Sequence, residues 1–277
     1  MITADLIPKR MRAMLMQMAP ARVRTLLFRL RNSIQSWWPY RISFQDRGLV
    51  RKESPFNFAV SRNNILEELG KKYKPTKQLH NYLVYYWLHF RDIRLEVRRV
   101  LEIGLETDRS IRMWEEFFPN AMVYGVDINP QCQQFEGDRR RVCIGDQSDV
   151  AFLDRVVNEA GGSFDIVIDD GSHRVDHQLK AFNFLFPRLS DHGIYVMEDT
   201  GGPVGDFNLI TVKALRALVD NIMYWPRGLD PGAWRNLSKF SGATSWIDRN
   251  IIGVAFYRWI VFVMRGRNPE DNPFLHE

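Results

Sequence analysis

The sequence is poor in cysteine and lacks long apolar runs. It has two cysteines, Cys132 and Cys143, too few for a disulfide framework or a cysteine-based zinc site. An uncharged apolar run of about 18 residues, the minimum for a transmembrane helix, does not occur. The N-terminus also lacks the clean apolar core of a secretion signal. We therefore expect a cytoplasmic protein with reduced thiols.

The composition, 45% apolar and 26% charged, is that of a globular protein. The length of 277 residues allows one large domain, or one domain with an extension. The net charge of +5 is unevenly distributed, because residues 1–52 hold 11 Lys and Arg against 2 Asp and Glu. A nucleic-acid-binding protein would usually spread its basic residues over the folded domain. We therefore predict no nucleic-acid partner.

Three zones follow one another along the chain. Residues 1–55 form a basic extension with an amphipathic stripe, residues 56–97 form a helical cap segment, and residues 98–277 alternate short apolar runs with helical stretches. A basic helix of this kind suits peripheral contact with an anionic membrane surface through residues 1–52. The alternative is packing on the protein's own core or on a neighbouring subunit of a homo-oligomer.

The third zone has the pattern of an α/β fold. Short apolar runs bounded by Gly, Asp or Asn suit strands that are buried on both faces. They lie at 99–104, 122–127, 141–145, 164–170 and 193–199, with helix-length segments at 109–118, 149–160 and 174–188 between them. The adjacent runs 251–257 and 259–266 can only pair antiparallel. We predict a Rossmann-like methyltransferase fold, a mostly parallel seven-stranded sheet with an antiparallel closing strand.

Acidic residues mark nearly every strand of this predicted sheet. Ligands of open α/β sheets bind outside the carboxyl ends of the strands, where these acids fall. The acids are Glu102, Asp127, Asp146, Asp169, Asp170, Glu198 and Asp199. A purely structural sheet has no need of a carboxylate at each strand end, so the pattern favours a binding site.

Three of these acids suit a nucleotide. Asp127 suits a ribose diol, because a carboxylate accepts two hydroxyl hydrogen bonds, although it could instead cap the next helix. Asp146 could accept from an adenine amino group, or bond only its own turn. Glu102, just before the Gly104 turn, could orient a bound amino group, or be a buried acid tied only to backbone.

The fourth and fifth strand ends predict a metal site. If these strands are neighbours, Asp170, Glu198 and Asp199 converge, and three ionised carboxylates need a cation. Oxygen ligands favour Mg²⁺, with Mn²⁺ or Ca²⁺ as alternatives, and pairing with an arginine is the competing interpretation. His173 follows closely and suits a general base for a hydroxyl, whereas its alternative is a polar residue at a helix start. His177 is expected to be structural.

The motifs LEIG, YGVDINP, GDQSD, FDIVIDDGSH and GIYVMEDT resemble a known family. They are similar to the metal-dependent sugar O-methyltransferases of the mycinamicin and tylosin type, which are related to rhamnosyl methyltransferases and cephalosporin-hydroxylase-like proteins. The similarity runs from about Lys72 to Gly266 and includes KYKPTK and HNY near its start. It departs from the family in the loop after Gly104, where Asp108 and Arg109 replace small residues.

The resemblance implies S-adenosylmethionine as methyl donor and Mg²⁺ as second cofactor. It implies His173 as the base and Asp170, Glu198 and Asp199 as metal ligands. It implies cofactor contacts for Glu102, Gly104, Ser110, Asp127 and Asp146. We expect a cofactor contact for Asp169 as well.

The expected function is methyl transfer to a hydroxyl of a sugar, either a deoxysugar or a sugar on a glycan or glycolipid. A metal that chelates a vicinal diol would lower the hydroxyl pKa and fix its position. A catechol-type acceptor and a non-catalytic methyltransferase-like scaffold are the alternatives, whereas a nicotinamide oxidoreductase would need a GxGxxG loop that is missing. The tryptophans Trp225, Trp234 and Trp246 could form an acceptor platform or belong to the core.

Overall fold

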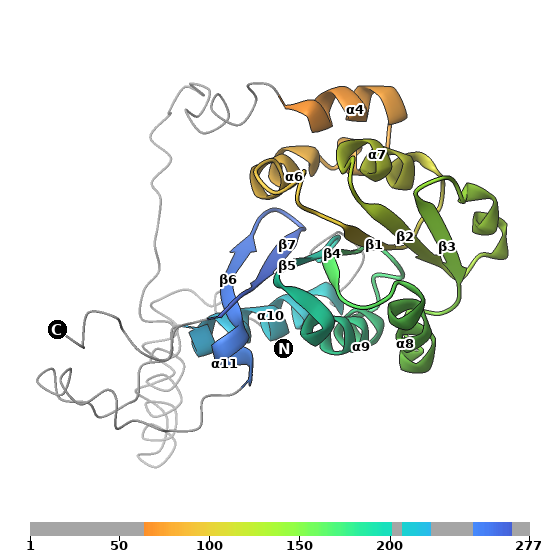
Figure 1. The fold of residues 1–277 in the computed structure, drawn as a ribbon. Coiled ribbons are helices and arrows are strands. Elements are labelled where there is room, and N and C mark those ends of the chain that lie inside the picture. The colour runs from red at the N-terminus through yellow and green to blue at the C-terminus, as the bar shows by residue number, and fades with distance from the viewer. Residues whose placement is uncertain (1–63, 201–206, 223–245, 268–277) are drawn as a thin grey trace, which may run out of the picture. The chain divides into compact units, whose positions relative to one another are not determined.

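The computed structural model describes residues 64–200, 207–222 and 246–267 (Figure 1). All of them belong to one compact unit, Pro55–Glu277. The predicted basic extension, residues 1–55, lies outside the described residues, as do Trp225 and Trp234. Among the described residues, every helix is too short or too polar to cross a membrane.

A seven-stranded sheet with the order β3-β2-β1-β4-β5-β7-β6 forms the centre of the fold. Its strands are β1 (Arg99–Ile103), β2 (Met122–Asp127), β3 (Arg140–Ile144), β4 (Phe164–Asp169), β5 (Leu189–Met197), β6 (Ile251–Phe256) and β7 (Val261–Arg265). The first five strands pair in parallel, and β7 pairs antiparallel with both β5 and β6. The predicted fold, a mostly parallel sheet with an antiparallel closing strand, is confirmed.

Strand β5 begins at Leu189, earlier than the predicted start at residue 193. Its pairing with β4 slips from Phe164↔Leu189 to Ile166↔Ile194, so β5 carries a bulge. The residues between Leu189 and Gly193 are polar, so the search for apolar runs did not detect the first part of this strand. Bulged residues are left unpaired and need no apolar partner.

Helices cover both faces of the sheet (Figure 1). On one face lie α4 (Ile65–Tyr73), α6 (Leu83–Phe90) and α7 (Arg109–Phe117). On the other face lie α8 (Val150–Glu159), α9 (Val175–Leu185), α10 (Phe207–Ile222) and α11 (Trp246–Asn250). The short helix α5 (Thr76–Leu79) and the 3₁₀ turns η2 (Pro130–Phe135) and η3 (Phe186–Arg188) complete the described elements.

Alternation along each strand produces two cores. Successive strand side chains point to opposite faces, so Val100 packs with α4, α6 and α7, whereas Leu101 packs with α8 and α9. Both residues are fully buried. The same alternation directs the side chain of Glu102 to the first face and that of Asp169 to the second, which decides the partners of these two acids.

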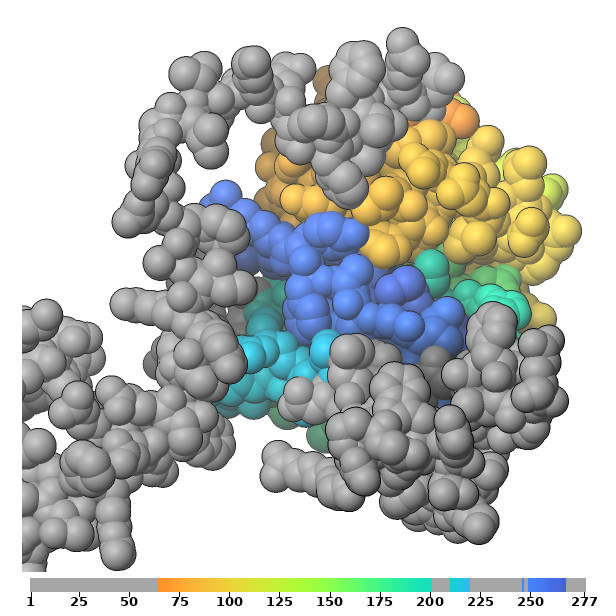
Figure 2. Space-filling view, turned by 90° about the vertical axis from the view of Figure 1, so that its left-hand side faces the viewer, coloured from red at the N-terminus to blue at the C-terminus, as the bar shows by residue number. Residues whose placement is uncertain are grey.

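The closing hairpin β6–β7 contacts α6 through aromatic rings. Tyr85 stacks on Tyr257 with ring centres 4.2 Å apart, and His89 stacks on Phe262 at the same distance. Figure 2 shows this hairpin, in blue, between the yellow segment that includes α6 and the cyan helix α10. Trp246 packs edge-on against Phe186 but is 38% exposed and does not line the cavity described below, so it belongs neither to the core nor to that wall.

Candidate functional site

A cavity of about 550 Å³ lies at the carboxyl ends of the parallel strands. The loops after all five parallel strands contribute to its wall, and the segment Pro75–His80 contributes from the helical cap. The predicted site residues that line it are Gly104, Ser110, Asp127, Asp146, Asp170, His173 and Asp199. Seven of the ten predicted site residues therefore line one cavity at this edge of the sheet.

Gly104 is required where the loop after β1 meets the loop after β4. Its φ is +86°, and an added Cβ would lie 2.7 Å from Gly171 Cα and closer still to the carbonyl oxygen of Asp170. Because a side chain is excluded on both grounds, backbone from the two loops lies in direct contact here. This close approach places the turn after β1 beside the loop that carries Asp170.

Asp127 organises the loop after β1. Its Oδ2 accepts hydrogen bonds from the backbone N–H groups of Leu105 and Glu106 at 2.8 and 3.2 Å, and its Oδ1 accepts from Asn129 at 2.8 Å. Asp146 accepts from the N–H of Ser148 at 2.7 Å, which lowers the pKa of its carboxyl. Asp146 thus makes the turn contact anticipated as its alternative. Asp127 does not cap the next helical turn as its alternative required, because Asn129 is the N-cap there. Both acids also line the cavity, and contact with a nucleotide stays a prediction.

The unusual residues after Gly104 turn toward other parts of the surface. Asp108 pairs with Arg112 at 3.1 Å, and Arg109 donates to the carbonyl oxygen of Lys74 at 3.4 Å. Glu106 lines the cavity and has a φ of +52°. Asp108 and Arg109, which distinguish this loop from the family pattern, therefore do not line the cavity. The cavity wall here consists of Leu105, Glu106 and Thr107.

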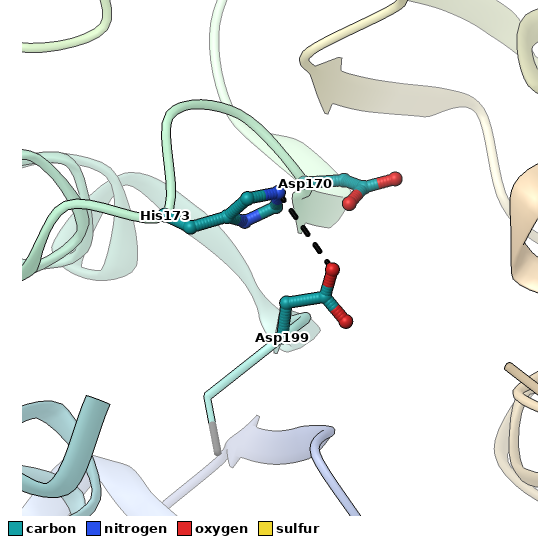
Figure 3. A group of neighbouring side chains, drawn as sticks. All are labelled: Asp170, His173 and Asp199. Atoms are coloured by element: carbon teal, nitrogen blue, oxygen red, sulfur yellow. Dashed lines mark ion pairs between the residues drawn. The ribbon is translucent and has the colours of Figure 1, made fainter. Parts of the chain in front are cut away.

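Asp170, His173 and Asp199 meet on the cavity wall (Figure 3). Their potential ligand atoms all lie within 4.8 Å of one another. His173 Nε2 is 3.7 Å from Asp199 Oδ2, and His173 has a φ of +55°. The Nδ1 atom of His173 is buried and has no hydrogen-bond partner among the described residues. An acidic, oxygen-rich grouping with an unsatisfied imidazole nitrogen fits a hard divalent cation and a proton acceptor beside it.

Asp199 is held by two side chains from the cap segment. Tyr82 Oη donates to its Oδ1 at 2.5 Å, and His80 Nδ1 lies 3.5 Å from the same oxygen. Burial of Tyr82, followed by its bond to Asp199, raises the pKa of the phenol far above its ordinary value, so the hydroxyl stays a donor. His80 also lines the cavity.

Glu198 faces the interior of the protein. Its side chain is 1% exposed, and its Oε1 accepts from Lys77 Nζ at 2.8 Å and from the hydroxyl of Tyr86. Burial and the charge of Asp170 raise the pKa of Glu198 to about 8. Burial alone would lower the pKa of Lys77, but the nearby carboxylates outweigh it and raise that pKa well above its ordinary value. A role for Glu198 as metal ligand stays a prediction.

Glu102 is also fully buried, on the face of the sheet covered by α7. It accepts hydrogen bonds from Ser110 Oγ at 2.9 Å and Trp114 Nε1 at 3.1 Å, and it pairs with Lys77 at 3.1 Å. Burial raises the pKa of its carboxyl, an effect that Lys77 partly offsets. The Glu102 side chain thus holds Ser110, which lines the cavity, in place. Direct contact of Glu102 with a bound amino group stays a prediction.

Asp169 lies on the opposite face and is fully buried. It accepts from Gln147 Nε2 at 3.1 Å and Tyr195 Oη at 3.0 Å, and burial raises its pKa to about 6. Gln147 Oε1 in turn accepts from the N–H of Ser172 at 2.7 Å. Asp169 therefore supports the loop that carries His173, and its predicted contact with a cofactor stays a prediction.

Sequence reasoning gave no role to four residues that hold the site together. They are Lys77, Tyr82, Tyr86 and Gln147. Lys77 and Tyr82 belong to the KYKPTK and HNY segments, whose likeness to a family segment was the available signal. Gln147 belongs to the GDQSD motif, from which only Asp146 received a role. Tyr86 stands in a stretch whose pattern indicated only a helix. His177 Nδ1 shares a hydrogen bond with Ser172 Oγ at 3.0 Å, which agrees with its expected structural role.

Curated relatives of this chain are sugar O-methyltransferases. One is the mycinamicin VI 2″-O-methyltransferase of Micromonospora griseorubida, 37% identical over 229 residues, which cover 76% of this chain and 55% of the relative. Another is the 8-demethyl-8-(2-methoxy-α-L-rhamnosyl)-tetracenomycin-C 3′-O-methyltransferase of Streptomyces olivaceus, 34% identical over 241 residues, 78% of this chain and 58% of the relative. The chain thus spans just over half the length of these relatives. No family model matches it.

A solved structure shows the same fold. The MycE methyltransferase of the mycinamycin biosynthetic pathway, in complex with Mg and SAH, superimposes with a TM-score of 0.63 at 35% identity. The match covers 76% of this chain and 59% of that one. The family resemblance inferred from the motifs is confirmed.

Proposed function

Because this chain is a homologue of the metal-dependent sugar O-methyltransferases, we propose that it transfers a methyl group from S-adenosylmethionine to a sugar hydroxyl. The observation that carries the proposal is the single cavity wall shared by Gly104, Asp127 and the Asp170–His173–Asp199 grouping. One half suits a nucleotide, and the other suits a divalent cation with an acceptor.

The relatives support a sugar as the acceptor. Two are named for methylation of the 2″ and 3′ hydroxyls of sugars on macrolide and tetracenomycin scaffolds. We propose a deoxysugar hydroxyl as the first acceptor class. A sugar carried on a lipid is the second, because residues 1–52 are strongly basic and would suit an anionic membrane surface.

Different residues of the cavity wall would bind the metal ion and the methyl donor. Asp170 and Asp199, with Glu198 as the third predicted ligand, would hold Mg²⁺ on the wall of the cavity. When bound, Mg²⁺ lowers the pKa of a coordinated hydroxyl, and S-adenosylmethionine supplies an electrophilic methyl group. The turn at Gly104 lets the loop after β1 approach the loop that carries Asp170, as only a glycine allows there, so a donor bound at this turn would lie beside the metal ligands.

His173 would remove the acceptor proton. Its Nε2 faces Asp199 at 3.7 Å, so the adjacent carboxylate can stabilise the imidazolium that forms when the proton arrives. Tyr82 and His80 fix that carboxylate from the other side. Most of the rate enhancement would come from positioning, because methyl transfer needs the acceptor oxygen in line at about 3 to 3.5 Å.

The test is a methyl-transfer assay with labelled S-adenosylmethionine and three acceptor classes: deoxysugar glycosides, lipid-linked sugars and a catechol. We expect a product heavier by one methylene from a sugar acceptor, lost on chelation of the metal and reduced about 100-fold or more in His173→Ala. His192→Ala removes an exposed histidine from the first part of β5, away from the cavity, so it is the matched control and should retain most of the activity. Methylation of the catechol alone would refute the sugar assignment, and no methylation of any acceptor by metal-loaded protein would count against the enzyme itself.

A further inference from the structure

The turn between β6 and β7 lies beside Asp199. Thr200, the next residue along the chain, donates its backbone N–H to the carbonyl oxygen of Trp259 at 3.0 Å. The hydroxyl of Tyr82, which donates to Asp199 Oδ1 at 2.5 Å, lies 3.5 Å from the same carbonyl oxygen. The turn is therefore attached to the loop that carries Asp199, although Trp259 itself does not line the cavity.

Trp259 has a backbone conformation that is unusual for its side chain. Its φ is +68°, in the left-handed region where a bulky residue is an outlier. The rest of the turn is well fixed: the Tyr257 N–H donates to the carbonyl oxygen of Ile260 at 2.9 Å, and the Tyr257 ring stacks on Tyr85. Strained residues cluster at active sites and ligand clamps, so this turn is a candidate for ligand contact.

Arg258 exposes a guanidinium group in the same turn. Its guanidinium carbon lies 4.3 Å from the centre of the Trp259 ring, within cation–π distance. The residue is exposed, and no carboxylate pairs with it among the residues that the structure describes. By contrast, Arg174 beside His173 pairs with Asp176 at 3.3 Å. Stacking on a ring orients a guanidinium while its N–H edges stay free to bind a carboxylate or a phosphate with two hydrogen bonds.

We propose that Arg258 and Trp259 form a subsite for an anionic group of the acceptor, a phosphate or a carboxylate on the sugar that is methylated. The inference rests on the proposed function, because it names a feature of the acceptor in that reaction. Trp259 is a positioning residue that holds the guanidinium group, and Arg258 binds the anion. Because the turn is attached to the Asp199 loop, a sugar bound beside Asp199 can extend a charged substituent toward Arg258.

The experiment measures equilibrium binding to the full chain by calorimetry, with S-adenosylhomocysteine and Mg²⁺ present so that no methyl group is transferred. Two matched ligand pairs are used: rhamnose 1-phosphate with methyl rhamnoside, and methyl glucuronide with methyl glucoside. We expect the charged member of at least one pair to bind more tightly than its neutral match by about tenfold or more, since hydrogen bonds to a charged group are the stronger ones. A gain with the phosphate alone or the carboxylate alone identifies the anion.

Arg258→Gln removes the charge and the paired donors, and should lose most of this preference. Trp259→Leu keeps the arginine without its platform and should retain only part of the preference, which a purely packing role for Trp259 would not alter. Arg155→Gln is the matched control, because Arg155 is also exposed and lies over an aromatic ring, Phe152 at 5.7 Å, but belongs to α8 and does not line the cavity. It should keep the wild-type preference.

Charged ligands that bind no more tightly than their neutral matches overturn the inference. A preference that Arg258→Gln leaves intact also overturns it, because the anion then binds elsewhere, such as at the metal ion. The proposed function is judged separately, by methyl transfer. A wild type that prefers the charged ligands but methylates no sugar contradicts that function and leaves the anion subsite in place.

Discussion

Replacing Gly104 by alanine should damage stability and ligand binding together. Two effects add at this position. Alanine at a φ of +86° is strained by about 1–2 kcal/mol. Its Cβ would also overlap the backbone of Asp170 and Gly171, and overpacking of this kind costs about 1–3 kcal/mol. We therefore expect Gly104→Ala to lower the free energy of unfolding by about 2–5 kcal/mol.

Gly161→Ala separates strain from overlap. Gly161 has a similar φ of +74°, but its added Cβ would meet only Arg99 Nη1, at 3.8 Å. It follows α8 and precedes β4, so it lies at the opposite edge of the sheet from the cavity. Strain alone applies there, about 1–2 kcal/mol, and ligand binding should be unchanged.

Urea unfolding followed by circular dichroism gives both free energies, and calorimetry gives the affinities for S-adenosylhomocysteine and Mg²⁺. Relief of the overlap at Gly104 must move the backbone that carries Asp170, so we expect a loss in Mg²⁺ affinity of about tenfold or more, about 1.4 kcal/mol. If Gly104→Ala is no less stable than Gly161→Ala and binds Mg²⁺ normally, the close approach of the two loops does not control the site.

Two further substitutions and one pH dependence can be checked by unfolding experiments. Burial lowers the pKa of His89 to about 4, so the unfolded state binds more protons as pH falls from about 6.5 to 4 and stability drops in that window. Partial exposure limits the loss from His89 to about 1–2 kcal/mol. His89→Phe should remove this contribution, so the difference in stability between wild type and variant should shrink as pH falls from about 6.5 to 4. Gln147→Glu should lower the melting temperature more than Gln147→Leu, because it sets a second carboxylate against Asp169. Trp114→Phe leaves the buried Glu102 short of a donor and should cost about 1–3 kcal/mol in urea unfolding.

The fold could be predicted from sequence because its signals are local. Continuous apolar runs ended by Gly or Asp marked the parallel strands, and the two adjacent runs at 251–257 and 259–266 could only form a hairpin. The start of β5 was missed because its bulge contains polar residues. The strand-end acids all lie at the edge of the sheet where the cavity is, since parallel strands bring their carboxyl ends together.

The division of those acids could not be predicted. Asp170 and Asp199 face the cavity, whereas Glu102, Asp169 and Glu198 are buried. What separates the two groups is side-chain direction at the strand ends and the partners that the cap segment and the loops supply. Lys77 comes from a four-residue helix far away in sequence, and a short basic segment carries no local signal of three carboxylate partners.

Calorimetric titration of wild type and Asp170→Ala with S-adenosylhomocysteine and with Mg²⁺ tests whether donor and metal bind in adjacent halves of one cavity. If Asp170 is a ligand of the metal only, the wild type binds both, and Asp170→Ala retains S-adenosylhomocysteine but loses Mg²⁺. Undiminished Mg²⁺ binding by Asp170→Ala, or no S-adenosylhomocysteine binding by the wild type, would contradict this arrangement.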